Sequence, residues 1–482
     1  MLTFFIALFL LIAGYMIYGK IVEKIFTIDD TNPTPAYKTN DGVDYMPMHP
    51  IKGWLIQLLN IAGLGPVFGA VAGAVYGPPA LIWIVVGCIF AGAVHDYFAG
   101  MLSLRHNGSQ FPALVERYLG KGVKVFIYIV SLALMILVTA AFTAGPAELI
   151  ALKTNGAIPF FAALIIIFAY FVMAAVLPIN KIIGRIYPFF GAVLIIMAVS
   201  VMIGLIFSDT PIPNLTFENQ HPAGLPVWPL IMVTISCGAI SGFHSTQSPI
   251  IARTVKKESD GRKVFFGAMI AEGVIALIWA TAGMTFFHGT GGLADALAAG
   301  GPAGVIDTIS IEMLGASGAI LAFLGAIILP ITTGDTALRS SRMMLTEAVS
   351  GIKKSGKSPK MIWMTICVGV PAFLLSTIDY TFLWRYLGFT NQTVAATMLW
   401  VATVYLLKEG KFHYIAGIPA LFMTGVVGTY FLYAPETLNL DYGISVIGGL
   451  IPVAVTGYLY VRATVRQKTS RKVAEAEAAY EH

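Results

Sequence analysis

The chain has 482 residues, of which 57% are hydrophobic and only 11% charged, with a formal net charge of +5. Soluble domains carry roughly 25% charged residues, so a chain this apolar cannot cover a water-facing surface. Three cysteines exclude a disulfide scaffold, and 30 basic against 25 acidic residues exclude the strongly basic surface of a nucleic-acid-binding protein. An all-α polytopic membrane protein remains.

Thirteen apolar segments follow one another along the chain, each long enough for the crossing of about 20 residues that a bilayer requires. They are residues 2–22, 53–76, 79–104, 122–144, 157–178, 187–207, 227–250, 264–287, 316–338, 361–378, 382–407, 413–433 and 443–463. The first lacks the basic start and small-residue cleavage site of a secretory signal, so we expect it to remain as a span.

Basic residues alternate between the loops that join these segments. Of the 30 Lys and Arg residues, 28 lie in odd-numbered loops and the tail, and only Lys153 and Arg385 belong to even-numbered loops. Because Lys and Arg mark cytoplasmic loops, we expect the N-terminus outside and the C-terminus in the cytoplasm. Adding or omitting one span would destroy this alternation. The tail after Arg462 is expected to be a short juxtamembrane helix or disordered.

Two segments carry backbone breakers and unusual polarity. Residues 60–69 hold two glycines before Pro66, and residues 236–249 hold Gly238, Gly242 and seven polar side chains. Such interrupted spans in corresponding positions are typical of a transporter binding site. Close helix packing through regularly spaced glycines is the alternative interpretation.

The interrupted segments are the second and seventh spans, so an odd offset separates them and they run in opposite directions. We therefore expect a five-plus-five inverted repeat. The predicted organisation is an N-terminal helix and loop (1–50), a first five-helix repeat (51–207), an inverted second repeat (208–411), two further helices (412–464) and a cytoplasmic tail (465–482).

Ionisable residues inside spans usually face a partner or a cavity, because a charge in hydrocarbon is costly. His95 and Asp96 adjoin in the third span, His244 lies in the interrupted seventh, and Glu272 lies in the eighth. Each is interpreted either as a proton carrier or substrate contact, or as a structural group that pairs helices or satisfies backbone.

Asp335 lies one helical turn before Arg339, so a structural pair between the two is one expectation. The preceding hydroxyls of Thr332, Thr333 and Thr336 offer oxygen atoms to a hard cation or a proton path. In the eleventh span Asn391 and Gln392 need partners, and Arg385 either extends to the interface or binds a carboxylate. Glu148 is expected in the outer vestibule, beyond the end of the fourth span.

Sequence signatures of enzymes and cofactors are missing from the chain: it has no G-x-S-x-G, H-E-x-x-H, Walker, Rossmann or C-x-x-C pattern. A haem held by His95 and His244 has no further motif to support it. We therefore predict no enzymatic activity, no cofactor and no metal.

Several motifs together resemble the carbon starvation protein A family. They are residues 31–36 (TNPTPA), 40–47 (NDGVDYMP), 61–66 (IAGLGP), 91–96 (AGAVHD), 238–244 (GAISGFH) and 330–339 (PITTGDTALR). Longer members of the family have Gln where His95 stands and carry extra C-terminal spans, so this chain resembles a shorter branch.

The resemblance implies a bacterial inner-membrane protein of the amino acid–polyamine–organocation superfamily, with the leucine-transporter-like five-plus-five fold. It implies that substrate binds at the two breaks and that a cation site lies between the second and ninth spans. The expected substrate-binding residues are Asn60, Ala62, Gly63, Gly65, Pro66, Gly238, Ser241, Gly242, His244, Ser245 and Gln247. The expected coupling residues are His95, Asp96, Glu272, Thr332, Thr333, Asp335 and Thr336.

The interrupted spans predict a secondary transporter, and the resemblance implies that it imports small organic nutrients (peptides or pyruvate) used in carbon starvation, coupled to protons. Half-helix N-termini at the breaks are expected to face the substrate carboxylate. A membrane sensor or structural protein without transport, and a sodium-coupled transporter of another carboxylate, are the alternatives. The expected partners are the substrate, the coupling proton and the lipid bilayer, without nucleic acid; substrate identity, coupling ion and oligomeric state stay open.

Overall fold

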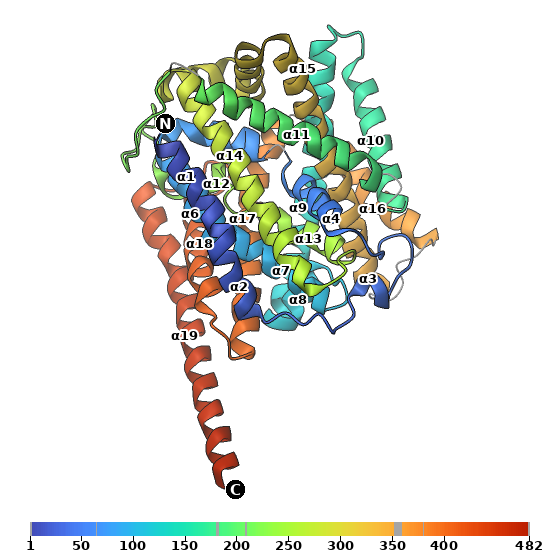
Figure 1. Ribbon diagram of the computed structural model, residues 1–482, viewed down its shortest axis with the longest axis vertical. Helices are drawn as coiled ribbons and strands as arrows, with labels where there is room; N and C mark the ends of the chain where they lie inside the picture. Colours follow the sequence, from blue (N-terminus) through green and yellow to red (C-terminus); the bar gives the residue numbers. More distant parts are fainter. Residues whose placement is uncertain are drawn as a thin grey trace.

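The computed structural model describes residues 2–63, 65–179, 183–207, 210–350, 359–378 and 380–480, and every regular element in that part of the chain is a helix (Figure 1). The α-helices are α1 (Leu2–Ala13), α2 (Gly19–Phe26), α3 (Pro35–Lys38), α4 (Pro50–Ile61), α5 (Ala70–Gly73), α6 (Pro79–Gly87), α7 (Ala93–Arg105), α8 (Phe111–Leu119), α9 (Lys121–Lys153), α10 (Phe160–Val176), α11 (Ile183–Ile206), α12 (Val227–Thr234), α13 (Phe243–Ala252), α14 (Gly267–Phe286), α15 (Thr290–Ser350), α16 (Pro359–Leu375), α17 (Tyr380–Lys408), α18 (Tyr414–Tyr433) and α19 (Tyr442–Tyr480). The all-helical prediction is confirmed.

Seven continuous helical stretches among the described residues are long and apolar enough to cross a membrane, and one bent pair of helices is an eighth candidate. They are Leu2–Phe26, Pro79–Arg105, Lys121–Lys153, Phe189–Ile206, Glu258–Phe286, Tyr414–Tyr433 and Tyr442–Thr469, with the pair Pro50–Ile61 and Gly65–Tyr76. Several stretches contain a short π-helical turn, such as η4 (Cys88–Gly92) between α6 and α7. The chain is therefore a multi-pass membrane protein, while the count of thirteen spans stays a prediction.

Some helices are longer than the sequence predicts. α9 continues past the expected end at residue 144 and through Pro146, so Glu148 lies on this helix rather than in a loop beyond it. Proline is tolerated inside membrane helices, because neighbouring groups satisfy the carbonyl that it leaves free. α15 has non-helical backbone at Gly301 and Gly315, so its last continuous helix follows Gly315, at the start of the segment expected from residue 316, and the helical residues before Gly315 are an addition that the sequence did not predict. α19 continues through most of the tail and projects beyond the other helices (Figure 1).

Both predicted interruptions are present. The helix axis bends by 57° between α4 and the following segment, where Ala62 has a non-helical backbone (φ −82°, ψ 56°). The second interruption separates α12 from α13 over residues 235–242, and Gly238 adopts φ +92° there. Few side chains tolerate that left-handed backbone, which explains a glycine at this position.

The loop between α2 and α4 is attached to the rest of the protein by a buried ionic cluster. Asp44 accepts from Arg339 at 2.6 Å and from Arg342 at 3.1 Å, and all three side chains are at most 3% exposed. Arg339 therefore pairs with Asp44, and the structure contradicts the alternative in which it pairs with Asp335. Arg339 extends away from the preceding turn, where it also donates to the carbonyls of Ala174 and Leu177.

The Asp44→Asn variant tests this cluster. Removal of the carboxylate leaves two arginines buried without their acidic partner, so we expect the free energy of unfolding to fall by about 3 kcal/mol. The matched control is Asp307→Asn, which breaks the more exposed Lys153–Asp307 pair and should cost less than about 1 kcal/mol. Denaturation of the purified proteins in detergent measures both; equal losses would contradict the assignment.

Candidate functional site

The two interruptions lie directly against each other. A methyl group built on Gly65 would lie 2.2 Å from Cβ of Cys237, and one on Gly69 would lie 2.8 Å from the carbonyl oxygen of Thr234. No side chain fits at such distances, so glycine is required for the backbones to approach. The spacing of these glycines thus serves close packing, which was one of the two interpretations of the sequence. This packing brings the two breaks together.

Side chains from neighbouring helices satisfy backbone groups that the second break leaves free. Trp83 donates its indole N–H to the carbonyl of Ile235 at 3.0 Å, and Gln392 donates to the carbonyl of Met232. Asn391 accepts the N–H of Phe243 at 2.7 Å. These contacts supply the hydrogen bonds that hydrocarbon cannot, as an irregular backbone in a membrane requires.

A cavity of about 260 Å³ lies where the breaks meet. Both interruptions and the helices α9, α15, α17 and α18 contribute to its wall. The lining residues are Ile61, Gly63, Gly65, Leu134, Val138, Phe142, Val233, Thr234, Ser236, Cys237, Ser241, Phe243, Thr333, Leu387, Gly388, Asn391, Tyr430 and Glu436. The wall is thus mostly apolar with a few polar groups, which is the usual character of a small-molecule site.

The predicted substrate-binding residues divide into two groups. Gly63, Gly65 and Ser241 line the cavity, whereas the others lie around it without forming its wall. Ser245 donates to the carbonyl of Gly242, and Gln247 donates to the hydroxyl of Thr246. The residues that do not line the cavity are Asn60, Ala62, Pro66, Gly238, Gly242, His244, Ser245 and Gln247.

Asn60 is the most unusual residue of the second group. Its side chain is completely buried at the end of α4, and neither amide atom has a hydrogen-bond partner among the described residues. An unsatisfied buried polar group costs about 1–3 kcal/mol. Both the donor and the acceptor of the Asn60 amide are thus left unsatisfied by the described residues around it.

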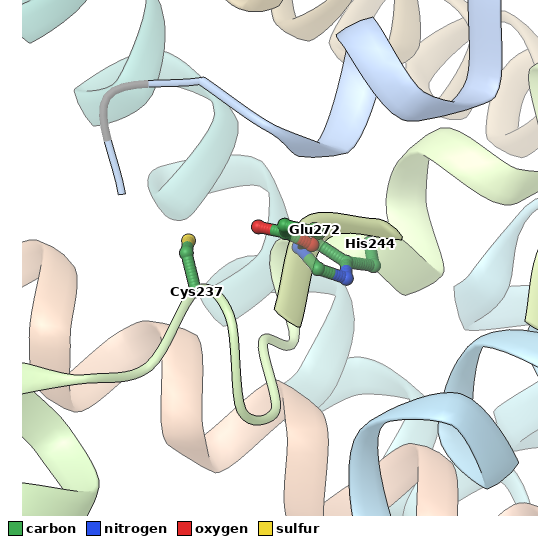
Figure 2. Close-up of side chains that lie close together, drawn as sticks. All are labelled: Cys237, His244 and Glu272. Carbon is green, nitrogen blue, oxygen red and sulfur yellow. Dashed lines mark ion pairs between the residues drawn. The ribbon is translucent and has the colours of Figure 1, made fainter. Parts of the chain in front are cut away.

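His244 lies near the N-terminal end of α13 between two carboxylates, of which Figure 2 shows that of Glu272. Its Nδ1 is 2.9 Å from Oδ2 of Asp96, and its Nε2 is 3.5 Å from Oε2 of Glu272. His95 contacts the other oxygen of Asp96 at 2.8 Å. These distances join four residues that the sequence offered as separate candidates from three spans into one cluster. All four side chains are fully buried.

Asp335 lies in a second cluster, on α15. Its two oxygens accept hydrogen bonds from the hydroxyls of Tyr170 at 2.8 Å and Tyr187 at 2.6 Å. No cation pairs with this fully buried carboxylate among the described residues, since Arg339 is occupied by Asp44. Asp335 can therefore be hydrogen-bonded in either protonation state.

The threonines near Asp335 mostly bond within their own helix. Thr332 donates to the carbonyl of Leu329, and Thr336 donates to carbonyls one turn before it. Thr333 alone reaches across to the first break, where it donates to the carbonyl of Leu59 at 3.3 Å and lines the cavity. The hydroxyls thus do not converge on one point as the ligands of a hard cation would.

Sequence reasoning missed some residues of these clusters. Cys237 lies within the predicted second break but was not selected, and its Sγ lies within 4.8 Å of ligand atoms of His244 and Glu272. Tyr170 and Tyr187 lie within predicted apolar spans and were not selected; the available signal was a hydroxyl that must find a partner in hydrocarbon. The side chain of Arg385 lies outside the described residues.

The Gly65→Ala variant tests the contact between the breaks. Because the new methyl group would overlap the side chain of Cys237, we expect a loss of roughly 1–3 kcal/mol of stability. Gly122→Ala is the control, since nothing lies within 4 Å of a methyl group at that helical position, and it should be neutral or slightly stabilising. If both variants melt at the same temperature as the unmodified protein, the close contact between Gly65 and Cys237 is contradicted.

Comparison with known proteins identifies the family. The profile of "Carbon starvation protein CstA" matches residues 1–166, 157–290 and 280–429. An "Uncharacterized membrane protein" of Haemophilus influenzae is 48% identical over 62% of this chain and 95% of its own length. The "Peptide transporter CstA" of Bacillus subtilis is 25% identical over 95% of each chain. The "Pyruvate/proton symporter BtsT" of Escherichia coli is 23% identical over 55% of this chain and 46% of its own length.

Among solved structures, a crystal structure of the Eremococcus coleocola manganese transporter covers 87% of this chain and 95% of its own, with a TM-score of 0.50 and 13% sequence identity. At that identity the similarity concerns the fold alone, which is that of a membrane transporter. With the profile matching along most of its length, the chain belongs to the carbon starvation protein CstA family.

Proposed function

We propose that this protein is a proton-coupled secondary importer of small organic nutrients, with short peptides favoured over pyruvate. The observation that carries the proposal is the cavity enclosed by two mutually packed helix breaks. Side chains and backbone ends of both breaks reach that cavity, so a bound molecule would contact both halves of the proposed repeat. Alternating access requires such a site, because movement of one half against the other then exposes the same molecule to either side.

The polar groups of the cavity favour a zwitterionic substrate. Asn391 uses its Oδ1 for the N–H of Phe243 and the hydroxyl of Ser241, at 2.7 and 3.1 Å. Its Nδ2 can therefore donate to a substrate carboxylate. The first N–H of α13, that of Phe243, is already bonded to Asn391, although the sequence analysis expected such an N-terminal group to face the carboxylate. Glu436 offers an acceptor for an ammonium group, and the described lining residues include no Lys or Arg. A peptide has both groups, whereas pyruvate has only the carboxylate.

Asp335 is the proposed carrier of the coupling proton. Its carboxyl group is buried without a cation and bonded to two tyrosines, and burial without a cation disfavours the charged form. It lies two residues after Thr333, which lines the cavity. The name of the Escherichia coli relative, a pyruvate/proton symporter, supports a proton as the coupling ion.

The proposal includes thirteen spans with a five-plus-five inverted repeat in the bacterial inner membrane. The two breaks and the membrane-transporter fold of the structural neighbour support it. So do the termini, since the N-terminus and the end of α19 lie at opposite ends of the molecule (Figure 1), as an odd number of crossings requires.

Uptake into proteoliposomes tests the function. With an inward proton gradient, we expect saturable accumulation of a labelled dipeptide, stronger than that of labelled pyruvate because only the peptide satisfies both Glu436 and Asn391. Dissipation of the gradient with an ionophore should abolish accumulation but leave exchange. Accumulation of pyruvate alone would overturn the peptide assignment, and accumulation that needs sodium instead of protons would overturn the coupling ion.

The Asp335→Asn variant tests the proton site. Asn keeps an oxygen that can accept from a tyrosine hydroxyl but cannot exchange a proton, so we expect gradient-driven accumulation to be lost while substrate exchange across the membrane persists. Asp307→Asn, at a partly exposed pair in the part of α15 before the kink at Gly315, should retain both activities. Full accumulation by Asp335→Asn would show that the coupling proton binds elsewhere.

A further inference from the structure

We propose that Cys237, His244 and Glu272 form a binding site for a divalent transition-metal ion of the zinc type beside the cavity. The three residues come from the second break, α13 and α14, and their ligand atoms all lie within 4.8 Å of one another (Figure 2). Small side-chain rotations bring three atoms at such separations to the bond lengths of about 2.0–2.3 Å that zinc requires. No other group of three such residues meets this condition in the described part of the chain.

Two of the three ligand groups of this site lack hydrogen-bond partners among the described residues, whereas the thiol of Cys237 lies 3.6 Å from the hydroxyl of Ser241. Nε2 of His244 and both carboxylate oxygens of Glu272 have no hydrogen-bond partner among the described residues, although both side chains are completely buried. Buried polar atoms are ordinarily satisfied. A cation between Nε2 and the carboxylate, which are 3.5 Å apart, satisfies both at once.

Asp96 orients the histidine for this role. Its carboxylate lies 2.9 Å from Nδ1 of His244, on the opposite side of the ring from Glu272. Histidine ligands usually donate one ring N–H to a carboxylate, which fixes the tautomer and directs the other nitrogen to the metal. With its proton on Nδ1, His244 presents the lone pair of Nε2 toward Glu272.

The donor atoms indicate the class of ion. A thiolate, an imidazole and a carboxylate suit zinc and related transition metals, whereas calcium and magnesium prefer oxygen ligands alone. Three protein ligands leave one tetrahedral position open. Cys237 lines the cavity and is partly exposed, so an ion can reach the site from the cavity.

A metal ion at this site would connect the irregular segment of the second break to α14. It would hold the break in the present conformation, so bound metal is expected to inhibit transport. This last consequence rests on the proposed function, whereas the binding itself does not.

Binding is tested on the full-length protein in detergent by titration with Cd²⁺, whose thiolate complexes absorb in the ultraviolet. We expect one saturable charge-transfer band, which Zn²⁺ removes by competition. Cys237→Ser should abolish the band, and Glu272→Gln should weaken binding by about tenfold or more. Cys367→Ser is the matched control, because Cys367 is exposed and distant in sequence from the site, and it should retain the band.

A second measurement uses the unmodified protein, in case a variant fails to fold. Zn²⁺ should protect Cys237 but not Cys367 from alkylation by a maleimide, as read by mass spectrometry of the two peptides. Absence of both the band and the protection would overturn the proposal and leave a proton between Glu272 and His244 as the group that satisfies them. A band that survives Cys237→Ser would overturn it as well.

Inhibition of transport is the final arm. Micromolar Zn²⁺ should reduce uptake by the unmodified protein reversibly on chelation, whereas uptake by Cys237→Ser, measured relative to its own rate in the presence of chelator, should not change. Metal binding without any measurable uptake would contradict the proposed function but not the metal site. Uptake that Zn²⁺ inhibits equally in both proteins would overturn the inhibitory role of Cys237.

Discussion

Backbone groups released in the middle of a membrane helix must find partners inside the protein, because lipid offers none. This requirement governs the centre of the molecule. The carbonyls of Met232 and Ile235 and the N–H of Phe243 are each taken up by a side chain of another helix. The glycines at 65, 69 and 73 then let the first break pack against the second. What the two breaks leave between them is the cavity.

Much of this centre could be predicted from the sequence. Clusters of glycine, proline and polar residues within two apolar segments located both breaks. Contacts between distant spans could not be predicted. Asp96, His244 and Glu272 were separate candidates, and only the packing of α7, α13 and α14 brings them into one cluster.

The expected pair of Asp335 with Arg339 shows why local spacing was not enough. One turn of helix makes that contact geometrically possible, but Asp44, from a loop almost 300 residues earlier, occupies the arginine instead. A sequence pattern with a period of one helical turn contains no information about such a partner. The same holds for Tyr170 and Tyr187, whose hydroxyls replace the cation at Asp335.

One helix joins three of these features. On α15, Thr333 lines the cavity, Asp335 bonds to the two tyrosines, and Arg342 pairs with the loop before α4. Arg342 lies nine positions after Thr333, which corresponds to roughly 13 Å along the helix axis. Because one helix carries all three, a tilt of α15 at the cavity would also displace Arg342 from Asp44, so substrate binding and the position of the loop before α4 would be mechanically coupled.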